Sequence, residues 1–236
     1  MDLKELSSVD PDVHWYYQSK LSALRLAIAR HGFDGGQILD VGAGSGFFST
    51  RLSRDYPGTS VFCVDPNYMA DQLRTEEGLV FTHRASAEEK RSSTLFLFID
   101  VLEHVSDDAT LLSEYIDSAS PGALVAITVP AFMSLWSGHD IFLEHHRRYR
   151  IHQVTRLARA KGLHVLHAQY LFGATFLPLW AMRRVTRHRR PATQMKPSHP
   201  LVNRALESVL TFEHQKHWNP IAGSSVMVIA KVGDRG

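Results

Sequence analysis

The sequence predicts an α/β fold with a doubly wound, mostly parallel sheet that carries helices on both faces. Two observations predict it. Short apolar runs alternate with stretches of helical periodicity along most of the chain, which is typical of βαβ units. A turn with three glycines follows the first apolar run and leads into the next helical stretch, as at the ligand-binding edge of such sheets.

The elements follow in order along the chain. A helix is expected over Val13–His31, where apolar residues recur at helical spacing until Gly32. Seven strands are expected at the apolar runs Gln37–Val41, Ser60–Val64, Leu79–Thr82, Thr94–Ile99, Ala123–Val129, His164–Tyr170 and Ser225–Lys231. Further helices are expected at Gly46–Asp55, Met69–Arg74, Asp107–Ala119 and His152–Lys161. Residues 171–222 interrupt the alternation, and we expect two helices there, around a loop at Pro191–Pro200.

Length and composition limit the domain organisation and the kinds of binding partner to be expected. The 236 residues are 44% hydrophobic, which suits one domain over 1–236, with residues 13–35 as an N-terminal helical cover and 171–222 as a basic helical insert. The formal net charge is +2, so no nucleic-acid partner is expected. Cys63 is the only cysteine, which excludes a disulfide within the chain and a zinc site built on cysteines.

The N-terminal residues and the basic insert indicate where the protein is expected to be located. Residues 1–12 are polar and acidic, and no apolar run is long enough to span a membrane, so we expect a cytoplasmic protein. Residues 171–190 begin apolar and end in arginines, a pattern that fits peripheral contact with an anionic membrane. A lid, an ordinary packed helix and a homodimer contact fit the same residues, and these interpretations stay open.

The segment Ile38–Phe48 carries the strongest chemical signal. An apolar strand runs into glycines at 42, 44 and 46, which allow unusual backbone angles and the close approach of a ligand. This spacing differs from the Gly-x-Gly-x-x-Gly of dinucleotide folds. Asp40 at the strand end suits a cationic amino group, and Asp65 at the end of the next strand suits a ribose diol. S-adenosylmethionine, a nucleoside with a charged amino-acid tail and no phosphate, meets both requirements.

With three further segments, this turn resembles the class I S-adenosylmethionine-dependent methyltransferases over nearly the whole chain. The segments are Ala85–Ala87, Ile99–Val105 and Pro121–Leu124. The resemblance implies a Rossmann-like sheet of seven strands with an antiparallel last strand, and S-adenosylmethionine as the cofactor. The cofactor-binding residues it implies are Asp40, Gly42, Ala43, Gly44, Gly46, Asp65, Pro66, Ala85, Ser86, Asp100, Val101 and His104.

A bacterial subgroup that acts on small molecules or is associated with lipids shows the greatest similarity. Its patterns resemble Val129–Ala131, Leu135–Asp140, His145–Tyr149 and Gly223–Ser225. Glu144 departs from the subgroup, in which glycine is usual at this position, so the loop geometry there is less closely implied.

Three histidines are candidates for a catalytic base, since imidazole titrates near neutral pH. His104 follows the fourth predicted strand, where a ligand would lie; it could instead only pack over the cofactor. His139 follows the fifth strand with Asp140 beside it as an orienting carboxylate, and a loop that merely closes the site is the alternative. His145 belongs to a dense cationic and aromatic cluster.

Five residues are candidates for binding the acceptor: Trp15, Tyr16, Asp140, Arg148 and Tyr149. We expect His145 and Arg148 to face inward and Arg147 to be solvated, because the cluster cannot all face one way. An inward arginine could hold a carboxylate or phosphate through two hydrogen bonds. No metal site is expected, since no His-Glu-x-x-His spacing occurs and the adjacent His145 and His146 diverge.

The sequence therefore favours methyl transfer to a small acceptor with a polar or anionic group. Two alternatives stay open. One is methylation of a membrane-associated or carrier-linked substrate, and the other is a non-catalytic S-adenosylmethionine-binding module that regulates a partner.

Overall fold

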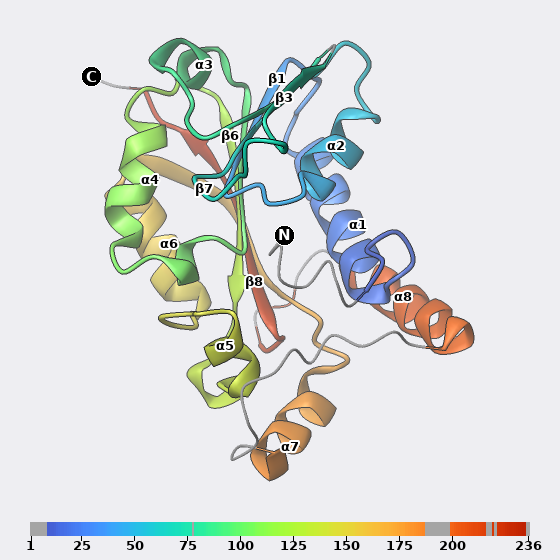
Figure 1. Cartoon of the computed structure of the whole chain (residues 1–236). Coiled ribbons are helices and arrows are strands. Elements are labelled where there is room, and N and C mark those ends of the chain that lie inside the picture. Colours follow the sequence, from blue (N-terminus) through green and yellow to red (C-terminus); the bar gives the residue numbers. More distant parts are fainter. Residues whose placement is uncertain (1–8, 77, 187–198, 216–218, 220, 235–236) are drawn as a thin grey trace.

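One eight-stranded sheet organises the chain, in the order β3-β4-β2-β1-β5-β6-β8-β7 (Figure 1). The computed structural model describes residues 9–76, 78–186, 199–215, 219 and 221–234. The strands are β1 (Gln37–Val41), β2 (Ser60–Val64), β3 (Arg74–Glu76), β4 (Leu79–Thr82), β5 (Leu95–Ile99), β6 (Leu124–Pro130), β7 (Leu163–Leu171) and β8 (Ser225–Val232). Strands β4, β2, β1, β5 and β6 are parallel, whereas β8 runs antiparallel between β6 and β7. All seven predicted strands and the antiparallel last strand are confirmed.

No helix forms over Met69–Arg74, and our prediction of one is wrong: residues 70–72 form turns, and Arg74 begins the additional edge strand β3. Residues 74–76 pair antiparallel with β4 instead. The Arg74 guanidinium lies 3.8 Å from the centre of the Phe81 ring, a contact that favours the paired edge. A window of six residues offers less than two helical turns, so local helix propensity could not outweigh this pairing.

The helices form two layers around the sheet. Their bounds are α1 (Trp15–Arg30), α2 (Phe47–Ser53), α3 (Ala87–Ser92), α4 (Asp108–Ile116), α5 (Gly138–Phe142), α6 (Ile151–Ala160), α7 (Phe176–Thr186) and α8 (Pro200–Gln215). Helices α1, α2 and α8 lie on one side and α4 and α6 on the other (Figure 1). Side chains alternate between the layers along each strand: Ile38 packs with the α1 side, and Leu39 with the α4 side.

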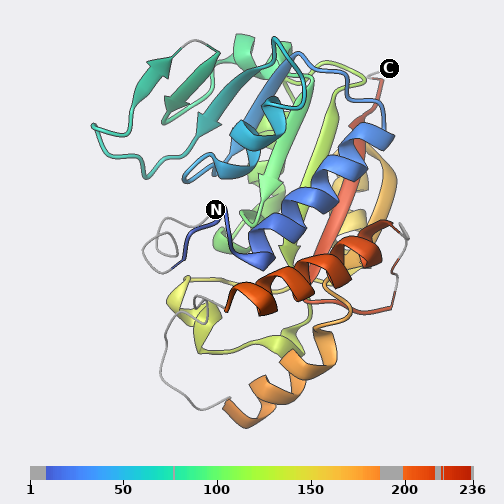
Figure 2. The same ribbon diagram turned by 90° about the vertical axis from the view of Figure 1, so that its right-hand side faces the viewer.

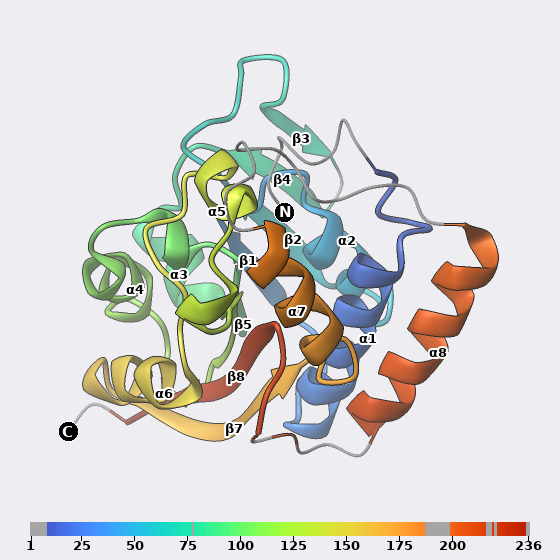
Figure 3. The same ribbon diagram turned by 90° about the horizontal axis from the view of Figure 1, so that it is seen from below.

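The predicted insert forms the two helices α7 and α8 between β7 and β8, and the loop predicted at Pro191–Pro200 lies largely outside the described residues. Helix α8 runs beside α1 (Figure 2), where the Asn203 side chain donates to the Val13 carbonyl oxygen at 3.0 Å. Helices α5 and α7 lie together beyond the carboxyl ends of the parallel strands (Figure 3). No helix in the described part of the chain is long and apolar enough to cross a membrane.

Two short helices, α3 and α5, were not predicted. Each begins with a capping box, in which a serine side chain and an acidic side chain three residues later satisfy each other's backbone N–H groups. The pairs are Ser86 with Glu89 and Ser137 with Asp140. Both helices are too short to show a clear apolar period, so the caps were their only local signal.

Candidate active site

The glycine-rich turn after β1 has the backbone that only glycine adopts readily. Gly42, Gly44 and Gly46 have φ values of +64°, +53° and +68°. A Cβ on Gly46 would lie 2.8 Å from Cys63 Sγ, and one on Gly42 would lie 2.8 Å from a Val101 methyl group. The turn is therefore tight against the sheet, and its shape depends on the first and third glycines whatever it binds.

We expect Gly46→Ala to lower the free energy of unfolding by about 1–3 kcal/mol more than Gly58→Ala, through overpacking. Both glycines have positive φ, but a Cβ on Gly58 would have no neighbour within 4 Å. Urea denaturation of both variants measures the difference. Equal losses of stability in the two variants would mean that the positive φ alone, and not the lack of space for a Cβ, explains the requirement for glycine at position 46.

Two carboxylates flank this turn. Asp40 is 3% exposed and accepts a hydrogen bond of 2.6 Å from the Ser49 hydroxyl; burial raises its pKa to about 6. Asp65 follows β2, and its Oδ2 accepts from the Gly44 N–H at 3.1 Å while Oδ1 accepts from the Asn67 N–H at 2.9 Å. Each oxygen of a carboxylate can accept two hydrogen bonds, so Asp65 retains the capacity for a ligand hydroxyl on each oxygen.

A third carboxylate, Asp100, follows β5 and is held by the chain itself. It forms an ion pair with Lys20 of α1, whose ammonium group also donates to the Tyr16 hydroxyl at 2.7 Å, and it accepts from the Thr128 hydroxyl at 3.0 Å. Lys20 is fully buried. Burial alone would lower the pKa of Lys20, but Asp100 outweighs it and raises this pKa above its usual value. Both Asp100 oxygens thus have partners within the chain.

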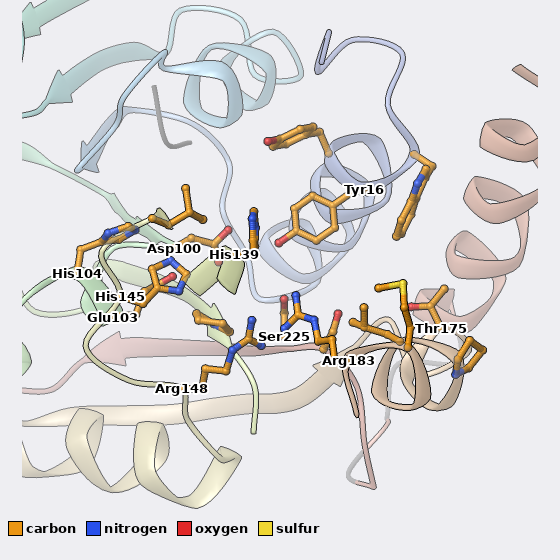
Figure 4. A pocket seen from close by; sticks show the side chains of 18 of the residues that line it. Tyr16, Asp100, Glu103, His104, His139, His145, Arg148, Thr175, Arg183 and Ser225 are labelled. Carbon is orange, nitrogen blue, oxygen red and sulfur yellow. The ribbon is translucent and has the colours of Figure 1, made fainter. Parts of the chain in front are cut away.

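A cavity of about 380 Å³ lies between α1, α5, α7 and the carboxyl ends of β5 and β6 (Figure 4). Aromatic and apolar side chains form most of its wall, and histidines, arginines and carboxylates gather on one side. The lining residues are Trp15, Tyr16, Tyr17, Phe48, Asp100, Glu103, His104, Pro130, His139, Leu143, His145, Arg148, Thr175, Pro178, Leu179, Met182, Arg183, Ser224 and Ser225.

Asp140 is the centre of the polar side. It is fully buried, and its Oδ1 lies 2.6 Å from Arg148 Nε and 3.0 Å from His145 Nδ1. Burial opposes ionisation of Asp140, but the hydrogen bond from His145 and the Arg148 charge hold its pKa well below the usual range. We expected this carboxylate to orient His139; it orients His145 instead.

Arg183 of α7 reaches the same network. It is 7% exposed, lies 3.8 Å from Asp140 Oδ2 and donates from Nη1 to the Leu135 carbonyl oxygen. Its Nε is buried without a hydrogen-bond partner among the described residues. Burial, together with the Arg148 charge, lowers the pKa of Arg183 to about 10.

Several predicted acceptor residues do line the cavity: Trp15, Tyr16, His104, His139, His145 and Arg148. Asp140 is not among the lining residues, and neither is Tyr149. Its hydroxyl donates to Asp108 Oδ2 at 2.7 Å, so it ties the cluster to α4. Arg147 is also not simply solvated, because it pairs with the same carboxylate at 3.2 Å.

The remaining predicted cofactor residues lie around the glycine turn. Ala43 is buried, Val101 packs against Gly42, and Pro66 follows Asp65 at the end of β2. Ser86 caps α3 through the Glu89 N–H, and Ala85 packs beside the α4-side core.

Three buried charged residues had no sequence signal strong enough to single them out: Glu103 and Arg183, which line the cavity, and Lys20, which pairs with the lining residue Asp100. Glu103 is fully buried, and burial, with the negative charge of Asp100, raises its pKa well above the usual range. Each is a charged residue type that is usually exposed, so only the tertiary fold reveals that it is buried.

Comparison with known proteins decides the family. A family model described as a methyltransferase domain matches residues 13–168, which include the glycine turn, the three carboxylates and His145. The chain belongs to this family. Residues 13–168 are a methyltransferase domain.

Individual relatives of this methyltransferase are distant. An uncharacterized methyltransferase of Mycobacterium tuberculosis strain H37Ra is 29% identical over 122 residues, covering 48% of this chain and 46% of the relative. The chain thus matches less than half the length of that relative. A crystal structure of an S-adenosylmethionine-dependent methyltransferase from Archaeoglobus fulgidus is 16% identical, with a TM-score of 0.53 over 90% of this chain and 94% of that one.

The methyltransferase also shares its fold with the [4+2]-cyclase SpnF, at 17% identity and a TM-score of 0.56 over 91% of this chain and 81% of that one. At this identity the likeness extends to the fold alone. The acceptor has to be inferred from the side chains of the cavity.

Proposed function

We propose that the methyltransferase acts on a small acceptor that carries a polar or anionic group and binds in the cavity beneath α1 and α7. The observation that carries this proposal is the pair of buried arginines, Arg148 and Arg183, which share one carboxylate, Asp140. Two positive charges against one negative charge leave the network of these three side chains positive. An anionic group of the acceptor would supply the missing charge and a partner for Arg183 Nε.

The donor would bind at the glycine turn. S-adenosylmethionine supplies an activated methyl group, so the chain has mainly to position the two reactants and exclude water. Asp65 would accept hydrogen bonds from the ribose hydroxyls, and the turn from Gly42 to Gly46 would let the ligand approach the backbone. Asp100 would act indirectly, because its ion pair with Lys20 fixes α1 over the cavity.

Among the histidines, His139 is our choice for the base that takes a proton from the acceptor. It is 7% exposed and lines the cavity (Figure 4). His145 is already engaged through Nδ1 by Asp140, and the His104 ring lies edge-on to the His145 ring, with their centres 4.6 Å apart. In this proposal residues 13–35 and 171–222 both belong to the methyltransferase domain, as the two covers of its cavity.

The test is methyl uptake from radiolabelled S-adenosylmethionine into a bacterial small-molecule extract, separated by anion exchange after the reaction. We expect the label in the fraction that the resin retains. Arg183→Met should reduce this uptake about 10- to 100-fold, since a hydrogen bond to a charged group contributes roughly 1.5–3 kcal/mol. Label confined to the unretained fraction would contradict the proposal.

Arg184→Met is the matched control. Arg184 is the exposed neighbour of Arg183 on α7 and lies over the Trp180 ring at 5.2 Å, so we expect its loss to leave uptake unchanged. Calorimetric titration with S-adenosylhomocysteine should give the same affinity for both variants. A loss of uptake in both variants would point to the helix as a whole and not to the Arg183 charge.

A second candidate is an acceptor linked to a membrane or a carrier. Large apolar side chains are exposed on the insert, among them Leu177 (70%) and Val185 (85%) on α7 and Leu201 (73%) and Phe212 (62%) on α8. Such a surface suits contact with an apolar partner. In the uptake experiment this candidate predicts label in the organic-solvent phase, together with salt-sensitive sedimentation of the protein with anionic vesicles.

A further inference from the structure

Glu103 is a buried carboxylate with no side-chain hydrogen bond to the described part of the chain. It is fully buried, it lines the cavity, and neither of its side-chain oxygens accepts a hydrogen bond from any described residue. Leaving such a group unsatisfied is unfavourable. The position therefore suits a ligand that supplies positive charge.

Two imidazoles stand beside this carboxylate. One ligand atom from each of Glu103, His104 and His145 can be chosen so that all three lie within 4.8 Å of one another. The His104 and His145 rings are nearly perpendicular, at 84°, and Figure 4 shows all three side chains on the same side of the cavity. Two imidazole nitrogens and one carboxylate oxygen form a ligand set common in metalloenzymes.

Asp140 forms a hydrogen bond with one of these candidate ligands, His145. Its Oδ1 lies 3.0 Å from His145 Nδ1, and its Oδ2 accepts from the Ser137 N–H at 2.9 Å. When a carboxylate accepts from one imidazole nitrogen, it fixes the ring orientation and leaves the other nitrogen to bind a metal. The His145–Asp140 pair therefore has the arrangement of a metal ligand with its supporting carboxylate.

We propose that Glu103, His104 and His145 bind a divalent transition-metal ion at the acceptor side of the cavity. Zn²⁺ or Fe²⁺ suits two imidazoles and one carboxylate, whereas Mg²⁺ and Ca²⁺ prefer oxygen ligands. Bonds of about 2.0–2.1 Å place tetrahedral ligand atoms roughly 3.3–3.4 Å apart, so binding requires the three side chains to close by small rotations. Spacing could not reveal this group, because Glu103 and His104 come from η1 (Leu102–His104) and His145 comes from the loop after α5.

The metal would leave open positions toward the cavity. An acceptor with an oxygen donor would fill one of them, and a metal lowers the pKa of a hydroxyl bound to it. This consequence rests on the proposed acceptor site, whereas the metal site itself does not. The proposal thus directs the search toward acceptors that are methylated on oxygen.

The test is binding of Co²⁺ to the full chain after dialysis against a chelator, followed by visible absorption and equilibrium dialysis. Co²⁺ follows Zn²⁺ in geometry and gives absorption bands that report its coordination. We expect one tightly bound ion, with affinity reduced in Glu103→Gln and His145→Gln by more than the roughly 10- to 100-fold that loss of an outer-shell partner causes. The matched control is His146→Gln, which removes the exposed neighbouring imidazole and should leave binding unchanged.

Glu103→Gln keeps the shape of the side chain and removes its charge, so we expect this variant to fold. Retention of full Co²⁺ affinity in folded Glu103→Gln would overturn the proposal, as would equal losses in His145→Gln and His146→Gln. Co²⁺ binding needs no acceptor and no donor. It therefore fails or succeeds independently of methyl uptake, and the two proposals are separable.

Discussion

Asp100→Asn is expected to lower the free energy of unfolding by about 3–5 kcal/mol, because it leaves the buried Lys20 ammonium without its counter-charge. Asn tolerates positive φ well, and Asp100 has a φ of +54°, so the substitution changes the charge with little effect on the backbone. Urea denaturation at neutral pH gives the value.

Three further variants isolate the ion pair. Lys20→Met should lower the free energy of unfolding by less, about 1–3 kcal/mol, because the Asp100 side chain that loses its partner is 26% exposed. Adding Lys20→Met to Asp100→Asn should restore part of the loss. Asp55→Asn is the matched control, since the exposed pair that Arg25 of α1 forms with Asp55 is expected to contribute only about 0.2–1 kcal/mol.

The stability of the protein is expected to change with alkaline pH in opposite directions in the parent chain and in Asp100→Asn. In the parent chain the pKa of Lys20 is raised above 10.5, so the stability from its pairing is complete below that pH and is lost as the pH rises through the folded-state pKa. In Asp100→Asn burial lowers this pKa instead, and stability should rise as the pH approaches 10.5 from below. A variant with the same alkaline profile as the parent would show that Lys20 finds another counter-charge.

Asp65→Ala is expected to weaken binding of S-adenosylmethionine and S-adenosylhomocysteine by about 10- to 100-fold. Hydrogen bonds to a charged group contribute roughly 1.5–3 kcal/mol each, and 1.4 kcal/mol corresponds to a factor of ten. Asp65→Asn keeps one acceptor oxygen and should lie between the parent and the alanine variant. Isothermal titration calorimetry measures all three affinities.

Asp71→Ala supplies the control for this series, because Asp71 is exposed on the loop that follows Asp65. Asp65 also accepts the Gly44 N–H, so the unfolding midpoint of each variant has to be compared as well. Donor affinity that stays unchanged in folded Asp65→Ala would remove this residue from the donor site.

The strands were predictable because each combines an apolar run with a nearby glycine or polar turn. β1, β2 and β4 have the predicted bounds. The helices were less predictable. The six residues Met69–Arg74 were too short a window to distinguish a helix from a turn, and the capping boxes of α3 and α5 were the only local signal for those helices. In the site, the inward orientation of His145 and Arg148 could be predicted, because the charged and aromatic residues of His145–Tyr149 cannot all face the interior. The burial of Lys20, Glu103 and Arg183 could not be predicted, since it depends on elements of the fold that are distant in sequence.

The two walls of the cavity have different origins along the chain. Residues 13–168 match the family, whereas Thr175, Pro178, Leu179, Met182 and Arg183 come from the α7 segment beyond that match. The parts of the molecule proposed to hold the donor therefore share no element with this wall. In the proposed arrangement, substitutions in α7 would alter which acceptor is admitted and leave the donor site unchanged. Such a separation gives a lineage a route to new substrates and an engineer a segment to exchange.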